Sequence, residues 1–283
     1  MPKIGEIYSE QVAICKKFDI LSADLRILIA HNEGFAQQID VIYHKDDEMK
    51  HPNLFLSQVD RLKQGEPVEY IIQESQFLGM NLFVDKNVLI PRGETEELVA
   101  LLSQKVSEYF DPRNFLVVAD IGTGSGAIVL GVKSSFPQWV CLASDIEEGA
   151  LKVARKNFAR YNISVQTECG DALEPYIKNS TKLDIIISNP PYIRDPNDAQ
   201  QSVRDFEPAS ALWLKEDNDV YEKIFKEVYQ VKKGALLMAF EISPDLVDHL
   251  KGLMESYLHD YEYEFLEDLS GLTRFLFVYL REE

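Results

Sequence analysis

The residues Asn189-Pro190-Pro191-Tyr192 place a side-chain amide, two prolines and an aromatic ring directly after an apolar, strand-like run, 184–188. Two consecutive prolines fix two φ angles and remove two amide donors, so the backbone of this turn is stiff. The Asn189 side-chain oxygen and the Pro190 carbonyl oxygen could each accept one proton of a planar –NH2 group and orient its nitrogen toward an electrophile. Tyr192 could cover the flat face of the substrate. We therefore predict Asn189, Pro190 and Tyr192 as catalytic residues, and the whole turn, Pro191 included, as the substrate-binding site. A rigid turn that binds nothing is the alternative.

A glycine-rich segment, 120–127, also lies between a strand-like run and a helical one. Glycine allows a sharp turn and a close approach of the backbone to a ligand, and the helix that follows offers its N-terminal amides. Gly122, Gly124 and Ala127 match the relaxed dinucleotide-binding pattern G-x-G-x-x-G/A. A nucleoside-containing cofactor is predicted to bind the five residues Gly122, Thr123, Gly124, Ser125 and Gly126. A tight turn without a ligand is again the alternative.

Acidic residues follow the next two predicted strands. Asp145, 23 residues after Gly122, could accept hydrogen bonds from both ribose hydroxyls of a nucleoside, or it could cap the following helix. Asp171 could accept a hydrogen bond from an adenine amino group. The predicted cofactor site also includes Ala172 and Asn189. These residues leave NAD and S-adenosylmethionine open as the cofactor.

Short apolar runs alternate with helical stretches after Pro112. The runs predict strands at Phe115–Ala119, Trp139–Ala143, Ser164–Thr167, Leu183–Ser188, Ala235–Phe240 and Phe275–Tyr279. Helices are predicted between them, for example at Glu147–Arg160 and Val220–Val231. Strands that alternate with helices form βαβ units and a mostly parallel sheet, so the predicted fold class is α/β. The Asn189 turn then lies at the carboxyl end of a strand, where open sheets of this kind bind ligands.

The first 75 residues lack this alternation and are predicted to be helical. Leu25, Leu28 and Ile29 follow the i, i+3, i+4 spacing of one helix face, and Pro52 suits a first helical turn. Residues 70–91 are rich in β-prone side chains punctuated by turn residues, which predicts a hairpin. The predicted organisation is a helical N-terminal domain, 1–75, a hairpin linker, 76–91, and an α/β domain, 92–283.

The composition argues against several partners. The 283 residues include 29 Lys and Arg and 47 Asp and Glu, a formal net charge of −18. A protein that holds nucleic acid by its phosphates needs a basic face, so we predict no stable nucleic-acid binding. Cys15, Cys141 and Cys169 are too widely spaced for a disulfide framework or a zinc site, so buried thiols and no metal are expected. No stretch approaches the ~20 apolar residues of a membrane span, and no signal peptide is seen, so we expect a cytoplasmic protein without membrane contact.

An Asn-Pro-Pro-Tyr turn after the fourth strand of the sheet resembles the turn of S-adenosylmethionine-dependent methyltransferases that act on planar amino or amide nitrogens. The resemblance is closer still to the HemK family, the release factor glutamine methyltransferases, which carry the same series of sequence blocks in the same order. The blocks are 65–71 (GEPVEYI), 88–96 (VLIPRGETE), 120–127 (DIGTGSGA), 188–193 (SNPPYI), 206–208 (FEP) and 268–275 (DLSGLTRF). They extend over nearly the whole chain.

This resemblance implies a Rossmann-like class I methyltransferase with a mostly parallel seven-stranded sheet, preceded by a small helical substrate-binding domain and a β-hairpin linker. It implies S-adenosylmethionine as the cofactor and class I peptide chain release factors as partners. The methyl group would go to the side-chain amide nitrogen of the glutamine in their Gly-Gly-Gln motif. A monomer is expected.

Three positions depart from the family pattern. Gly93 stands where a second proline is usual, Ser243 where glycine is usual, and Ala172 where some relatives place an aromatic residue against the adenine. Arg92 and Glu94 look like a structural or substrate-path pair rather than catalysts.

Three other functions remain as alternatives. A methyltransferase that acts on the exocyclic amino group of adenine or guanine in nucleic acid would carry the same turn, but this chain has no basic target-recognition region. An NAD-dependent oxidoreductase would explain the glycine loop but not the Asn189 turn. A binding module without catalytic activity would keep both motifs and bind the cofactor without transferring a methyl group.

Overall fold

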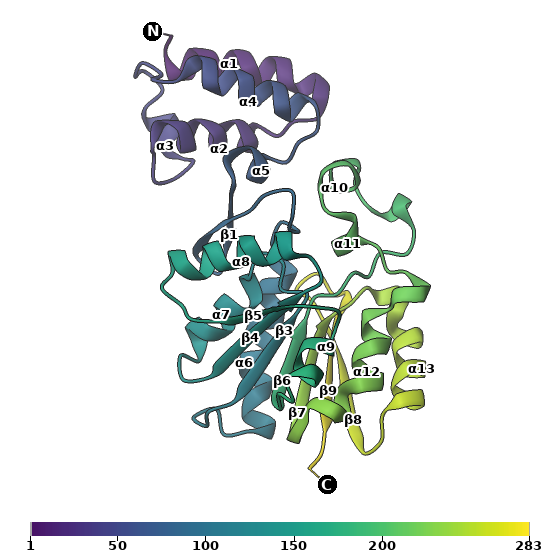
Figure 1. The fold of residues 1–283 in the computed structure, drawn as a ribbon. Coiled ribbons are helices and arrows are strands. Elements are labelled where there is room, and N and C mark those ends of the chain that lie inside the picture. The colour runs from purple at the N-terminus through teal and green to yellow at the C-terminus, as the bar shows by residue number, and fades with distance from the viewer. Residues whose placement is uncertain (1, 283) are drawn as a thin grey trace. The chain divides into compact units, whose positions relative to one another are not determined.

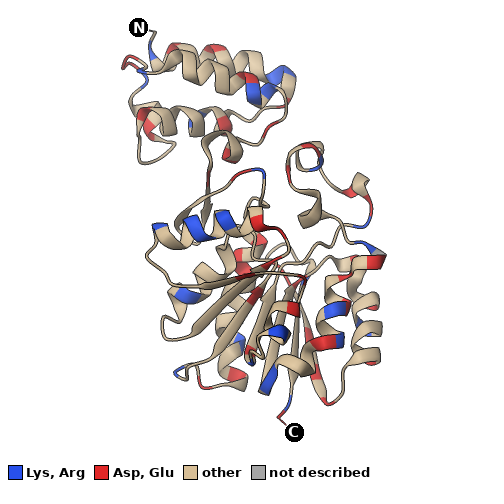
Figure 2. Ribbon diagram, in the orientation of Figure 1, with Lys and Arg blue, Asp and Glu red and all other residues tan. Residues whose placement is uncertain are grey.

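A computed structural model describes residues 2–282, so residues 1 and 283, the outer ends of the predicted domains, lie outside the described part. The chain divides into two compact units (Figure 1). The first contains the residues up to 74 together with 201–206, and the second contains 75–200 and the residues from 207 onward. Acidic and basic residues both occur on helices of each unit (Figure 2). Within residues 2–282, no helix combines the length and the apolar character that crossing a bilayer requires.

The first unit is helical, as the sequence predicts. Its helices are α1 (Ile4–Cys15), η1 (Lys16–Phe18), α2 (Ser22–Glu33), α3 (Asp40–Tyr43), α4 (Pro52–Lys63), α5 (Val68–Ile72) and α10 (Gln201–Phe206). Leu25, Leu28 and Ile29 are completely buried, which confirms the predicted apolar face of α2. Pro52 occupies the first turn of α4, where its missing N–H costs nothing. The predicted helical domain, 1–75, does not include α10, which belongs to this unit. The predicted domain boundaries remain a prediction.

The second unit begins with a hairpin and contains a seven-stranded sheet. The hairpin strands are β1 (Glu74–Phe77) and β2 (Met80–Phe83), as predicted. The sheet strands are β3 (Val117–Ile121), β4 (Val140–Asp145), β5 (Gln166–Cys169), β6 (Leu183–Ser188), β7 (Lys232–Glu241), β8 (Tyr261–Glu267) and β9 (Thr273–Leu280). Their order is β5-β4-β3-β6-β7-β9-β8, and all neighbours are parallel except β9, which is antiparallel to β7 and β8. The mostly parallel sheet predicted from the sequence is therefore confirmed.

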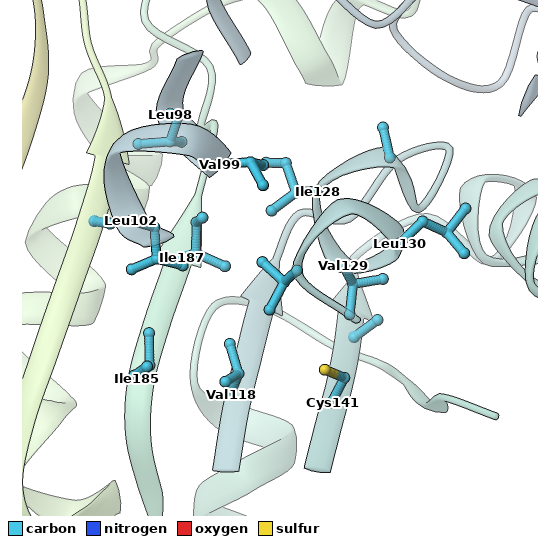
Figure 3. Close-up of a cluster of buried hydrophobic side chains, with 14 of the residues drawn as sticks. Leu98, Val99, Leu102, Val118, Ile128, Val129, Leu130, Cys141, Ile185 and Ile187 are labelled. Atoms are coloured by element: carbon cyan, nitrogen blue, oxygen red, sulfur yellow. The ribbon is translucent and has the colours of Figure 1, made fainter. Parts of the chain in front are cut away.

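Helices cover both faces of this sheet (Figure 1). The helices and helical turns of the second unit are α6 (Gly93–Tyr109), α7 (Ala127–Ser135), α8 (Glu148–Arg160), α9 (Glu174–Lys178), η2 (Pro196–Asp198), α11 (Ala209–Leu212), η3 (Glu216–Asn218), α12 (Val220–Val231), η4 (Pro244–Leu246) and α13 (Val247–Tyr257). Side chains of α6, α7 and α8 share one buried cluster, and those of α9, α12 and α13 share another. Successive strand residues point to opposite faces, so Ile185 and Ile187 lie in the first cluster and Ile186 in the second. Figure 3 shows Ile185 and Ile187 with the α6 residues Leu98 and Leu102.

Two details differ from the sequence prediction. Phe115, expected in the first strand, is 75% exposed and precedes β3, which begins two residues later at Val117. Cys15 and Cys141 are buried as expected, but Cys169 is exposed because it ends β5, an edge strand of the sheet. No group of residues within 2–282 has the composition and geometry of a metal site.

Candidate active site

A cavity of about 320 Å³ opens at the carboxyl ends of the central parallel strands. Its walls come from the segments that follow β3, β4, β5 and β6, from residues 87–91 after the hairpin, and from residues 208–220. This is the edge at which open α/β sheets bind ligands. The turn and the glycine loop, 68 residues apart from Gly122 to Pro190, both contribute to it.

The glycine loop faces the cavity through Gly122, Thr123, Gly124 and Ser125. Gly122 and Gly124 have φ angles of +70° and +53°, and a Cβ atom added to either would meet no atom within 4 Å. The amides of Gly122 and Thr123 both donate to the Ser144 carbonyl oxygen at 2.9 Å, which fixes the loop to the end of β4. The loop therefore presents bare backbone to a ligand.

Gly126 has a different place from its predicted cofactor contact. It lies at the start of α7 with φ +82° and is not among the residues that line the described cavity. A Cβ at this position would lie 2.5 Å from Cε1 of Phe158 on α8. The structure thus gives Gly126 a packing role between two helices.

Asp145 ends β4 and lines the cavity with both carboxylate oxygens engaged. Its Oδ2 accepts from the Gly124 amide and its Oδ1 from the Glu147 amide, each at 2.9 Å. Burial raises the pKa of this carboxyl above its usual range, while hydrogen bonds from the backbone amides of Glu147, Gly124 and Ile146 oppose the shift. Asp145 therefore anchors the glycine loop and the turn before α8, but it does not cap that helix, whose N-cap residue is Glu147. A carboxylate has roughly four lone-pair sites, so Asp145 keeps accepting capacity toward the cavity.

The predicted adenine end of the cavity contains Asp171 and Ala172, both of which line it. Lys223 of α12 forms an ion pair with Asp171, a partner that the sequence did not indicate. Ile146, the residue after Asp145, also lines the cavity and is 52% exposed. An apolar side chain left open beside a predicted ribose site offers a surface for a flat base.

The Asn-Pro-Pro-Tyr turn contributes Asn189, Pro190 and Pro191 to the cavity wall. Asn189 Nδ2 donates to Thr95 Oγ1 at 3.2 Å, and Thr95 Oγ1 donates to Glu241 Oε2 at 2.7 Å. Thr95 is 5% exposed and Glu241 is 1% exposed. Burial raises the pKa of Glu241 to about 7.

Tyr192 lies away from its predicted position over the substrate. Its hydroxyl donates to Glu241 Oε1 at 3.3 Å, and its ring packs against the buried cluster of α9, α12 and α13. It is not among the residues that line the described cavity. Burial and the Glu241 charge raise the pKa of its hydroxyl. Trp213, not Tyr192, is the aromatic residue that lines the cavity. Its segment is held next to the turn by two backbone hydrogen bonds: the Ile193 amide donates to the Leu212 carbonyl oxygen, and the Leu214 amide donates to the Ile193 carbonyl oxygen.

Arg92 forms an ion pair with Glu207 and not with Glu94, the partner predicted from the sequence. The side chain of Glu207 is 1% exposed. Glu207 Oε2 also accepts from the Ile90 amide at 3.1 Å. Glu207 thus holds Ile90 and Arg92, whose chain neighbours Pro91 and Pro208 line the cavity, and Glu94 is exposed.

Proteins of similar sequence and similar fold are known. Residues 98–221 match the family model of the methyltransferase small domain. Two solved structures share the fold: a methyltransferase from Pyrococcus furiosus (TM-score 0.50, 16% identity, 73% of this chain and 91% of that one) and a 16S rRNA methyltransferase from Thermus thermophilus (TM-score 0.52, 14% identity, 74% and 50%). The sheet, the glycine loop and the matching family model define a class I methyltransferase.

The sequence relatives define the family more narrowly. A release factor glutamine methyltransferase of Bacillus subtilis is 37% identical over 78% of this chain and 77% of its own length. One from Rhodopirellula baltica is 32% identical over 89% of this chain and 87% of its own length. The chain belongs to the release factor glutamine methyltransferase family, and the family predicted from the sequence blocks is confirmed.

Proposed function

We propose that this protein transfers the methyl group of S-adenosylmethionine to the side-chain amide nitrogen of the glutamine in the Gly-Gly-Gln motif of class I peptide chain release factors. The observation that carries the proposal is the Asn189-Pro190 turn at the wall of the cavity, in a chain of this family. The Asn189 side-chain oxygen and the Pro190 carbonyl oxygen supply two acceptors for the two protons of one amide.

The residues of the cavity suit S-adenosylmethionine. The bare backbone at Gly122 and Gly124 leaves room for the methionine part, and the remaining lone pairs of Asp145 would accept from the ribose hydroxyls. Asp171 would accept from the adenine amino group with Ile146 and Ala172 beside the ring. When bound, the cofactor supplies a methyl group on a positively charged sulfur.

The main contribution expected of the protein is to orient the glutamine nitrogen toward the methyl group. Asn189 and Pro190 would hold the glutamine nitrogen toward the methyl group, whose transfer exchanges a C–S bond for a C–N bond, and the proton that the nitrogen gives up would pass to solvent. Correct placement of two reactants can lower a barrier by roughly 7–11 kcal/mol. Oxygens that accept from the amide also stabilise the positive charge that develops on its nitrogen. A strong general base is not needed, because the nitrogen becomes acidic once it carries the methyl group.

The helical first unit is proposed to bind the body of the release factor, as predicted from the family resemblance. It contains exposed apolar residues, among them Leu21 (66%) and Tyr43 (76%), which a protein partner could cover.

The test is one assay with labelled S-adenosylmethionine and purified release factor, either wild type or with the loop glutamine replaced by alanine. Label is expected on the wild-type factor and none on the replaced one. Label that persists after the replacement would overturn the substrate assignment. Parallel incubations with DNA and with ribosomal RNA test the amino-group alternative, and transfer to either in place of the factor would favour it.

A further inference from the structure

The side-chain amide of Asn189 can occupy its site in two orientations that differ by a half turn about its last bond. The two have nearly the same shape, but only one turns the oxygen toward the substrate. In the other, an N–H group would face the N–H groups of the glutamine amide, and no hydrogen bond could form. A methyltransferase that relies on this oxygen must therefore fix the orientation.

Two buried residues supply that constraint. Thr95 carries one hydroxyl proton, which it donates to Glu241 Oε2 at 2.7 Å. The Thr95 oxygen can then only accept, and Asn189 lies against it at 3.2 Å. Since only Nδ2 of the amide can donate, the nitrogen must face Thr95 and the oxygen must face away. An ionised carboxylate at the end of this chain of hydrogen bonds thus sets the direction of every bond in it.

We propose that Thr95 and Glu241 are positioning residues that hold the Asn189 amide with its oxygen toward the substrate nitrogen. The inference rests on the proposed function, because the direction matters only when the substrate brings two donors. Neither residue lies on the turn itself. Thr95 stands in the first turn of α6, and Glu241 ends β7.

The fold brings them to the turn for a simple geometric reason. β6 and β7 are parallel neighbours, and Ser188 lies opposite Phe240. The next residues, Asn189 and Glu241, therefore lie at the same edge of the sheet, where Glu241 is still paired with Phe275 of β9. The main-chain oxygen of Glu241 accepts from the buried Tyr221 hydroxyl at 2.7 Å, which fixes the end of the strand.

The same carboxylate also holds the other end of the turn. Glu241 Oε1 accepts from the Tyr192 hydroxyl at 3.3 Å. One buried group thus fixes the first and the last residue of Asn189–Tyr192, and the two prolines keep the span between them stiff. This accounts for Tyr192 without placing its ring on the substrate.

Protonation of Glu241 would remove the constraint. The groups that face it are Thr95 and Glu94 on α6, Tyr192 on the turn, Arg274 on β9 and Tyr221 on α12. Arg274 favours the charged form, whereas burial and Glu94 favour the neutral form and bring the pKa to about 7. A neutral Glu241 can donate to the Thr95 oxygen, and Thr95 can then donate to Asn189, which permits the wrong orientation. Activity is expected to fall as the pH drops through about 7.

The test compares Thr95→Val, which keeps the shape and loses the hydroxyl, with Thr95→Ser, which keeps the hydroxyl. With release factor as substrate, Thr95→Val is expected to lower kcat about 10- to 100-fold, with the KM for the factor and the Kd for S-adenosylmethionine changed about twofold or less. Thr95→Ser is expected to retain kcat close to wild type. Wild-type kcat in Thr95→Val, or an equal loss in both variants, would overturn the proposal, since the second result would assign the effect to packing.

Glu241→Gln provides a second measurement that does not depend on Thr95. Its kcat is expected to be low and to lack the fall near pH 7 that the wild type shows. Asp120 is also buried, with a pKa raised to about 7, and it is present in both proteins, so only a fall that Glu241→Gln removes belongs to Glu241. A fall that persists in Glu241→Gln contradicts the proposal. If the wild-type enzyme methylates no release factor, the proposed function fails rather than this inference. Thermal unfolding of each variant tests whether the chain is still folded.

Discussion

The Asn189 side chain offers one acceptor to the cavity, and its removal is the most direct test at the scale of a single residue. In Asn189→Ala one of the two proposed amide contacts is lost, while Asp145 and the glycine loop, the proposed cofactor contacts, stay in place at the cavity wall. Loss of one such preorganised contact typically costs about 100- to 1,000-fold in kcat. We expect a loss of this size in methyl transfer to release factor, with the Kd for S-adenosylmethionine largely unchanged in calorimetric titration. A normal rate in this variant would show that Asn189 does not orient the substrate.

Asp145 provides the matching test for the cofactor. Its carboxylate holds the amides of Gly124 and Glu147 and is proposed to hold the ribose as well. Hydrogen bonds to a charged group contribute roughly 1.5–3 kcal/mol each, so Asp145→Ala should weaken cofactor binding at least about 10-fold. The Kd of Asp145→Asn for the cofactor should lie between those of the wild type and Asp145→Ala, because asparagine keeps the size and one acceptor. Thermal unfolding separates a direct loss from a loosened loop. A dissociation constant equal to that of the wild type in Asp145→Ala would remove the ribose assignment.

Cavity residues that directly follow predicted strands were predictable from the sequence, whereas Trp213 and the buried supports of Asn189 were not. Asn189 and Asp145 stand directly after apolar strand runs, so their position at a strand end can be inferred from local pattern alone. Thr95 bonds to Glu241 across 146 residues of sequence. Only the folded sheet, with its particular register between β6 and β7, brings such residues together, and single-sequence periodicity carries no information about that pairing.

At the scale of the elements, Gly126 joins the glycine loop to helix packing. Gly126→Ala should lower the free energy of unfolding for two reasons: its φ of +82° is strained for a side chain, by about 1–2 kcal/mol, and the new Cβ would meet Phe158 at 2.5 Å. Overpacking of this kind costs roughly a further 1–3 kcal/mol. Gly271→Ala is the matched control, because Gly271 has φ +79° and open space around it. The difference between the two variants in the free energy of unfolding, measured with denaturant, isolates the contact with Phe158. Equal losses of stability in the two variants would show that the packing of the helices does not require glycine at position 126.

The predictability of an element follows how deeply it is buried. Every residue of β6 is buried, so its apolar run coincides with the predicted strand, Leu183–Ser188. β8, an edge strand, has exposed Glu262 and Glu264 and therefore lacks a continuous apolar run. α10 has six residues and none of them is buried, so it offers no helical period to detect. Exposed and short elements depend on neighbours that the local sequence does not specify.

At the scale of the whole molecule, the net charge of −18 is expected to affect how fast the protein associates with its partner. Basic residues are present on the helices, for example along α8 in Figure 2, but acidic residues outnumber them by 47 to 29. A partner that contacts RNA would need a basic surface. We therefore expect an acidic enzyme and a basic partner to attract one another before contact, which raises the association rate more than the affinity of the final complex.

Salt dependence tests this attraction. Because the screening length falls from about 30 Å at 0.01 M to about 8 Å at 0.15 M ionic strength, kcat/KM for release factor should fall about 10-fold or more over that range while kcat changes little. An uncharged peptide that carries the Gly-Gly-Gln sequence is the control, since its kcat/KM should stay flat. Unfolding temperatures measured in the same buffers exclude a loss of folded enzyme. If the rate with the whole factor is as flat as the rate with the peptide, charge does not guide the encounter, and the excess of acidic residues serves only to keep the protein in solution.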